Sequence, residues 1–203
     1  PDFPPRGAPR GRIDMSGIDL VMLGHAHIDL GYRWDIQETV HRIAPDTFRG
    51  VLAVMDRTPG FTFCQSQLFL YDAMERHEPE LFARIRDAIR SGRWEVVGGA
   101  WCEYDASLPS GESVIRQHLQ GHRYAADRLG VQENRIGFVP DSFIAHAATL
   151  PQILAGCGIR SYLFGRGLPA GARRAFRWVG PDGSSLVAYL PFGPYANPPL
   201  TPE

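Results

Sequence analysis

Short apolar runs alternate along the chain with segments whose apolar positions recur at helical steps. The runs predict strands, and the segments with a period near 3.6 residues predict helices. The predicted strands cover 18–23, 61–64, 94–97, 135–139 and 161–164, and the predicted helices cover 35–56, 68–74, 79–91, 110–129 and 150–155. Such alternation is typical of an α/β fold with a mostly parallel sheet and outer helices, as an open layer or a barrel.

Local signals mark several boundaries of these elements. Asp35 can cap the first helix, whereas Pro45 should kink or split it because proline has no backbone N–H to donate. Gly92 and Gly130 follow helices at positions where glycine commonly ends them. After the last parallel strand, the runs 176–179 and 186–189 flank a Pro-Asp-Gly-Ser turn and predict a β-hairpin.

The two ends of the chain differ from its middle. Residues 1–16 are rich in proline, glycine and arginine without periodicity, which predicts a flexible lead-in. No segment approaches the roughly 20 apolar residues of a membrane span, so no membrane association is expected. The chain has no initiating methionine and ends on a proline-rich stretch, so we expect it to be part of something longer.

Composition narrows the classes of function. The 21 basic and 22 acidic residues nearly cancel, so a nucleic-acid partner is not predicted. Every basic residue is arginine, which excludes lysine Schiff-base chemistry, pyridoxal phosphate attachment and P-loop phosphate binding. Three widely spaced cysteines, Cys64, Cys102 and Cys157, indicate reduced thiols and therefore a reducing, cytoplasmic compartment.

The segment Gly24–Asp29 reads Gly-His-Ala-His-Ile-Asp directly after the first predicted strand. If the strand continues into this motif, its two-residue period places His25, His27 and Asp29 on one side. Imidazole and carboxylate groups at a strand end are suited to zinc and related divalent metals. The alternative is a pair of core histidines with an aspartate in a turn.

Asp141 follows the strand predicted at 135–139, as His27 and Asp29 follow the first strand. Functional groups collect at the carboxyl ends of parallel strands, so the three side chains together form a plausible metal site. The alternative for Asp141 is a helix N-cap. A second histidine pair, His118 and His122, shares one helical face, which we expect to be solvated.

Four blocks of the sequence, at 24–32, 98–117, 140–154 and 176–189, resemble the N-terminal catalytic domain of glycoside hydrolase family 38, the retaining zinc α-mannosidases. The match is especially specific at Leu108–Ser113 and Leu150–Leu154. The resemblance implies a barrel-like (β/α) domain of seven strands, incomplete at its C-terminus, with residues 17–203 forming its N-terminal part. It also implies a mannose-containing oligosaccharide or glycan as substrate, and leaves a homo-oligomer of the full-length protein open.

By position, the resemblance implies that His27, Asp29 and Asp141 bind Zn²⁺ and that Asp141 is also the catalytic nucleophile. His25 would be a neighbour of these ligands. The residues implied to contact the sugar are Tyr32, Phe143, Arg166 and Asp105.

A retaining glycosidase needs a second carboxyl group, roughly 5 to 5.5 Å from the nucleophile, to protonate the leaving oxygen. In family members this acid and a further histidine ligand lie beyond the corresponding end of this chain. The loop after Asp141 also departs from the family pattern, since Phe143–His146 reads Phe-Ile-Ala-His and is one residue longer. This piece alone is therefore expected to hold only part of an active site.

Two other classes of function remain open. One is a metal-dependent hydrolase of the amidohydrolase, phosphoesterase or polysaccharide deacetylase kind, in which the metal activates water. Amidohydrolase and phosphoesterase sites need several further histidines at strand ends, and most of the remaining histidines fall in predicted helices. The other is a non-catalytic sugar-binding fragment.

Overall fold

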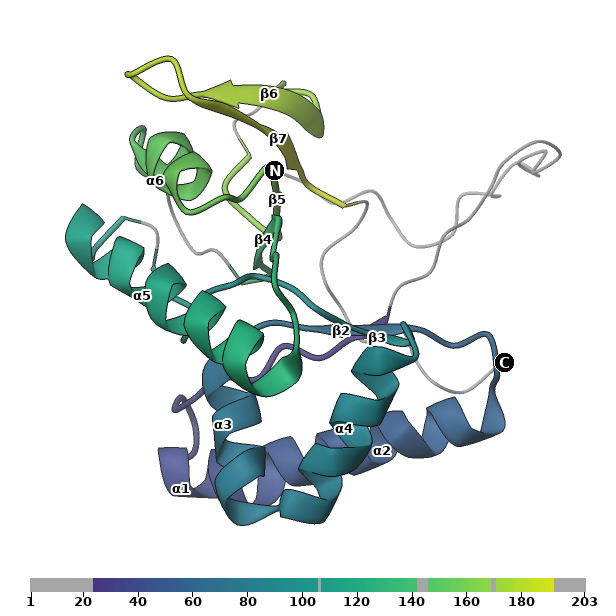
Figure 1. Cartoon of the computed structure of the whole chain (residues 1–203). Helices are drawn as coiled ribbons and strands as arrows, with labels where there is room; N and C mark the ends of the chain where they lie inside the picture. Colours follow the sequence, from purple (N-terminus) through teal and green to yellow (C-terminus); the bar gives the residue numbers. More distant parts are fainter. Residues whose placement is uncertain (1–23, 106, 142–145, 169–170, 192–203) are drawn as a thin grey trace, which may run out of the picture.

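The computed structural model describes residues 24–105, 107–141, 146–168 and 171–191. In this part of the chain, one sheet has the order β1-β2-β3 and the other has the order β4-β5-β7-β6 (Figure 1). Paired strands are parallel except for β6 and β7. The bounds of the strands are β1 Gly24–His25, β2 Phe63–Gln65, β3 Trp94–Val96, β4 Ile136–Val139, β5 Ser161–Phe164, β6 Ala175–Val179 and β7 Ser185–Tyr189. The predicted α/β class with a mostly parallel arrangement is confirmed.

Gly98 joins the two sheets just beyond β3. Its backbone N–H donates to the carbonyl of Ile136, at the start of β4, over 2.8 Å. The residue has a φ of +82°, and a Cβ there would lie 3.1 Å from the Cβ of Ser66. Both the left-handed conformation and the close approach favour glycine. Gly98 therefore lets the chain beyond β3 approach β4 closely enough for a backbone hydrogen bond between the two sheets.

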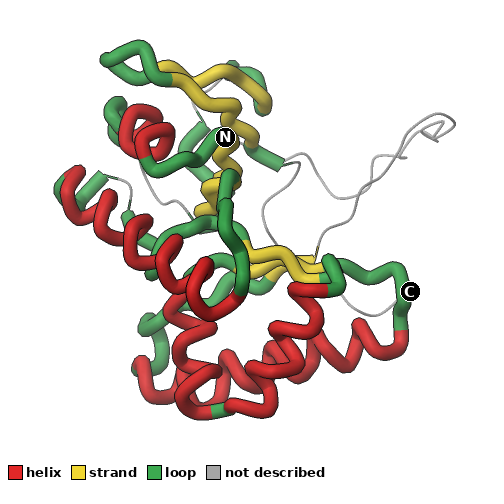
Figure 2. The backbone as a smooth tube through the Cα atoms, viewed as in Figure 1, coloured by secondary structure: helices red, strands yellow, loops and turns green. Residues whose placement is uncertain are grey.

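Helices lie outside the strands, as Figure 2 shows by colour. In the first half they are α1 Ile36–Glu38, the π-helical turn η1 Thr39–Ile43, α2 Ala44–Arg57, α3 Leu68–His77 and α4 Pro79–Arg90. Except for α1, these helices share a hydrophobic core with the first sheet, where Phe48 packs edge-on against Trp94 at 5.3 Å between ring centroids. The Trp94 indole donates to the Tyr71 hydroxyl over 2.9 Å, so this buried polar group is satisfied.

The helix predicted over 35–56 forms as one run of α1, η1 and α2. Asp35 caps it as predicted, since its Oδ1 accepts from the backbone N–H of Glu38 over 2.8 Å. The irregularity expected at Pro45 takes the form of the π-helical turn, which ends at Ile43, two residues before the proline. A π turn widens the helix locally, so the helix can continue although Pro45 donates no backbone hydrogen bond.

The second half carries α5 Gly111–Tyr124, the π-helical turn η2 Ala125–Leu129 and α6 Leu150–Gly156. The prediction of a solvated face for His118 and His122 is wrong for His118, which is 1% exposed. Its Nε2 lies 3.0 Å from the Tyr104 hydroxyl, because α5 packs against the chain that follows β3. Gly130 ends η2 with a φ of +75°, as its position predicts.

Helix α5 and η2 together contact both hydrophobic clusters of the molecule. Val114, near the start of α5, belongs to the cluster around the second sheet. Tyr124, Ala125 and Leu129 belong to the cluster around the first sheet and its helices. This one helical run therefore packs against both layers.

The hairpin predicted near the end of the chain is confirmed. β6 and β7 pair antiparallel, and the Gly183 N–H closes the turn on the Gly180 carbonyl over 3.0 Å. The predicted strand 18–23 and lead-in 1–16 lie outside the described residues. No helix in the described ranges has the length and apolar character needed to cross a membrane.

Candidate metal and sugar site

A pocket of about 330 Å³ opens where the chain leaves four strands. The segment after β1 contributes His27 and Asp29, the chain after β2 contributes Gln67, that after β3 contributes Glu103, and that after β4 contributes Asp141. The carboxyl ends of parallel strands meet at one edge, which explains how residues far apart in sequence line one pocket. The three residues predicted as metal ligands, His27, Asp29 and Asp141, are all among them.

His27 faces two carboxylates in this pocket. Its Nε2 lies 2.9 Å from Glu103 Oε2 and 3.7 Å from Asp29 Oδ1. Burial acts to lower the His27 pKa, but the hydrogen bond and charge of Glu103, with the charges of Asp29 and Asp141, outweigh it and raise the pKa above the ordinary value. The surroundings of His27 therefore favour a cation at this point.

Asp141 is held by two neighbours. Its carboxylate Oδ1 lies 2.6 Å from Arg166 Nε, and its backbone N–H donates to Glu103 Oε1 over 3.3 Å. Its side chain is 10% exposed, so the ion pair with Arg166 is largely protected on the aspartate side. The alternative reading of Asp141 as a cap of the helix through Leu150 is wrong, because Thr149 occupies that position.

The donor set suits zinc by its chemistry. One imidazole and the carboxylates of Asp29, Glu103 and Asp141 line the same pocket, and zinc binds nitrogen and carboxylate oxygen. Within the described ranges, no three His, Cys, Asp or Glu side chains converge closely enough to hold an ion as they stand. The reason lies in the existing pairs, since His27 is turned to Glu103 and Asp141 to Arg166.

His25 has a different environment from His27. It is absent from the pocket lining, its Nδ1–H donates to the Cys64 carbonyl over 3.0 Å, and its ring packs edge-on against Phe138. Burial lowers its pKa to about 4. β1 ends at His25, so the two-residue alternation does not carry all three motif side chains to one side.

Of the residues expected to contact the sugar, some lie at the pocket or beside Asp141 and others do not. Arg166 contacts Asp141, and Asp105 lines the pocket while its Oδ1 accepts hydrogen bonds from Ser107. Those hydrogen bonds hold the pKa of the Asp105 carboxyl below its usual range. Tyr32 is 70% exposed and does not line the pocket. Phe143 lies outside the described residues.

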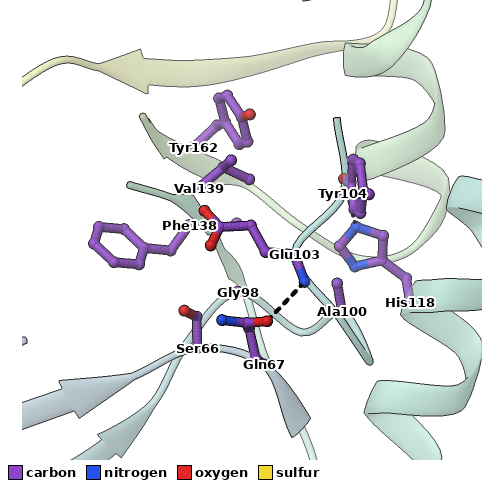
Figure 3. A pocket seen from close by; sticks show the side chains of 11 residues that line it. Ser66, Gln67, Gly98, Ala100, Glu103, Tyr104, His118, Phe138, Val139 and Tyr162 are labelled. Atoms are coloured by element: carbon purple, nitrogen blue, oxygen red, sulfur yellow. Dashed lines mark hydrogen bonds between the residues drawn. The ribbon is translucent and has the colours of Figure 1, made fainter. Parts of the chain in front are cut away.

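Sequence reasoning missed two residues that the structure places at the pocket, Glu103 and Gln67. Glu103 lies two residues before Asp105 in the extended chain after β3, so the position at a strand end was a usable signal. Gln67 carried no signal in the sequence. Both also line a smaller cavity of about 10 Å³, room for about one water molecule, together with Tyr104 and His118 (Figure 3).

Comparisons with known proteins agree with this architecture. The family model described as the glycosyl hydrolases family 38 N-terminal domain matches residues 17–202. Alpha-mannosidase G of Dictyostelium discoideum is 36% identical over 173 residues, which are 83% of this chain and 16% of that protein. Human alpha-mannosidase 2C1 is 36% identical over 174 residues, which are 84% of this chain and 16% of that protein.

Among solved structures, an alpha-mannosidase from Enterococcus faecalis V583 matches with a TM-score of 0.73 and 25% identity, over 83% of this chain and 19% of that one. The chain thus spans less than a fifth of the length of these relatives. On the family match and this fold, the chain belongs to glycosyl hydrolase family 38, within its N-terminal domain.

Proposed function

We propose that the protein containing this chain hydrolyses α-mannosidic bonds with retention of configuration, assisted by zinc. The observation that carries the proposal is that Asp141, His27 and Asp29 line one pocket in a chain of family 38. The relatives named above are alpha-mannosidases, and a mannose-containing glycan is the corresponding substrate class.

In this proposal Asp141 is the nucleophile. Its carboxylate oxygen forms a bond to the anomeric carbon while the bond to the leaving oxygen breaks, and that oxygen takes a proton from a carboxyl group outside this chain. Water then releases the sugar, and two inversions give net retention. Arg166 orients the Asp141 carboxylate through their ion pair, which favours a defined direction of attack.

Zinc would be held by His27, Asp29 and Asp141, and it would supply a fixed positive charge that orients the sugar hydroxyls. The Asp29 side chain is 38% exposed, which makes it more accessible to an incoming ion than the Glu103 and Asp141 carboxylates. We assign sugar binding to Asp105, which lines the pocket, to Arg166, which pairs with Asp141, and to Tyr32 and Phe143. The free thiols of Cys64, Cys102 and Cys157 support a reducing compartment such as the cytoplasm.

The decisive experiment is trapping of a covalent intermediate. A fluorinated mannoside that is released slowly should leave a glycosyl adduct on Asp141, detected by mass spectrometry of the digested full-length protein. The variant D141N should form no adduct and lose activity by about a thousandfold or more. A protein that turns over the mannoside without any adduct would instead be a hydrolase in which the metal activates water.

A further inference from the structure

Gln67 has a backbone conformation that is unusual for its residue type. Its φ is +63°, and it is the one residue other than glycine with a positive φ in the described ranges. A conformation of this kind is strained and persists only where the surrounding structure holds it. The side chain is only 3% exposed. The packing and bonding of a buried amide therefore hold this strained position.

The Gln67 amide bridges two segments of the pocket. Its Nε2 donates to the backbone carbonyl of Ile28 over 2.7 Å, and Ile28 lies between His27 and Asp29. Its Oε1 accepts from the backbone N–H of Glu103 over 3.2 Å, which Figure 3 shows as a dashed line. One side chain thus joins the chain after β1 to the chain after β3, beside the contact between the His27 and Glu103 side chains.

Backbone hydrogen bonds beside Gln67 hold the start of α3 next to the chain that the Gln67 amide contacts. Helix α3 starts at the next residue, and the N–H groups of Leu68 and Phe69 donate to the carbonyls of Ala100 and Trp101. The positive φ of Gln67 accompanies the placement of the first turn of α3 alongside the chain that follows β3. The Gln67 amide adds a third connection to that chain, two residues further on at Glu103.

We infer that Gln67 is a positioning residue of the metal site: its amide fixes the spacing between the His27–Asp29 turn and Glu103, and so holds the His27 imidazole toward the pocket. This inference rests on the zinc site of the proposed function. It assigns Gln67 no contact with substrate, because the residue is only 3% exposed and its amide oxygen and nitrogen bond to backbone groups. Residues that orient metal ligands through hydrogen bonds typically change metal affinity 10- to 100-fold when altered.

Zinc titration of the full-length protein and two variants tests the inference. Q67L removes both hydrogen bonds and keeps the strained backbone, whereas Q67G removes the bonds and relieves the strain. Each variant should bind zinc about 10- to 100-fold more weakly, measured by calorimetry where circular dichroism shows the protein folded. Equal losses in both variants identify the amide, and not the backbone conformation, as the cause.

Gln65 provides the matched control. It is another fully buried glutamine, and its Nε2 donates to the Ser66 carbonyl and to neither pocket segment. Q65L should keep zinc affinity within about twofold, even where its thermal stability falls.

The outcomes distinguish failure of the role inferred for Gln67 from failure of the proposed zinc site. Unchanged zinc affinity in Q67L and Q67G, beside a wild type that binds zinc, would overturn the role of Gln67 alone. An increase in KM with unchanged zinc affinity would also overturn it, since that pattern marks a substrate contact. A wild type that binds no zinc would overturn the proposed metal site and the inference together.

Discussion

Arg166 Nε and Asp141 Oδ1 lie 2.6 Å apart, although the two residues follow different strands of the second sheet. β4 and β5 are parallel neighbours in register from Ile136 with Ser161 to Val139 with Phe164, so the residues beyond their carboxyl ends are brought together. The pairing is therefore a direct consequence of the order of the strands. It places a positive charge beside the carboxylate that we propose as nucleophile.

Removal of this charge should impair catalysis more than folding. We expect R166A to lower kcat/KM by about 10- to 100-fold on an aryl α-mannoside, because the Asp141 carboxylate loses its orienting partner. Arg177 on β6 is a matched control, since its guanidinium donates to Ser185 and lies outside the pocket. R177A should retain nearly full kcat/KM, and an equal loss in both variants would contradict a specific role for Arg166.

Loss of Asp29 should weaken zinc binding. We expect D29A to raise the zinc dissociation constant at least about tenfold, because a carboxylate ligand is lost. Asp35 serves as the control, since it caps α1 six residues later and is absent from the pocket lining. D35A should cost about 1 kcal/mol of stability and leave zinc affinity unchanged. Chelation of zinc should abolish activity, and added zinc should restore it.

His118 should make stability depend on pH. Burial lowers its pKa to about 3 in the folded protein, against 6.5 for an ordinary histidine. The folded state thus keeps the ring neutral where the unfolded state takes up a proton, so this contribution to stability is full above pH 6.5 and is lost as the pH falls from 6.5 toward 3. Its ring faces Tyr104 and His122, and His122 also disfavours the charged form.

The measurement is the free energy of unfolding at pH 7.5 and 5.5 for wild type and H118N. Between these values the wild type should lose about 1.3 kcal/mol more than the variant, since the unfolded His118 gains most of one proton. The comparison cancels the contributions of other histidines such as His25. An equal loss in both proteins would show that His118 titrates normally in the folded state.

The contact between the two sheets at Gly98 should be sensitive to a single methyl group. G98A combines backbone strain with a Cβ only 3.1 Å from the Cβ of Ser66, so we expect a loss of about 2 to 4 kcal/mol. Gly92 is the matched control, because it has a similar φ of +74° and open space around its Cβ position. G92A should lower the free energy of unfolding, measured with denaturant, by only about 1 kcal/mol. Equal losses in G98A and G92A would contradict a steric contribution from Ser66.

The alternation of elements was predictable from sequence because buried strands and amphipathic helices differ in hydrophobic period. The strand predicted at 161–164 forms as β5 over the same residues, and the hairpin follows its turn signal. The burial of His118 was not predictable, since periodicity shows which residues share a face but not what covers that face. Likewise, Pro45 signals an irregular helix without specifying a π-helical turn.

The meeting of His27, Asp29 and Asp141 at one pocket was also predictable, because parallel strands share a carboxyl edge. The contacts within the pocket were not. Glu103 reaches His27 across 76 residues of sequence, and Gln67 reaches Ile28 across 39, so both depend on how the sheets and α3 pack. Their roles, like those of the predicted ligands, stay predictions until the experiments above are done.

The run of α5 and η2 has a consequence for how the molecule unfolds. Its N-terminal residues are buried among side chains of the second sheet and its C-terminal residues among those of the first. Melting of either sheet would strip part of this helical run of its apolar cover, and short isolated helices are marginal in water. We therefore expect the two sheets to lose structure in a single cooperative transition, with amide protons in β2 and β5 exchanging through the same opening.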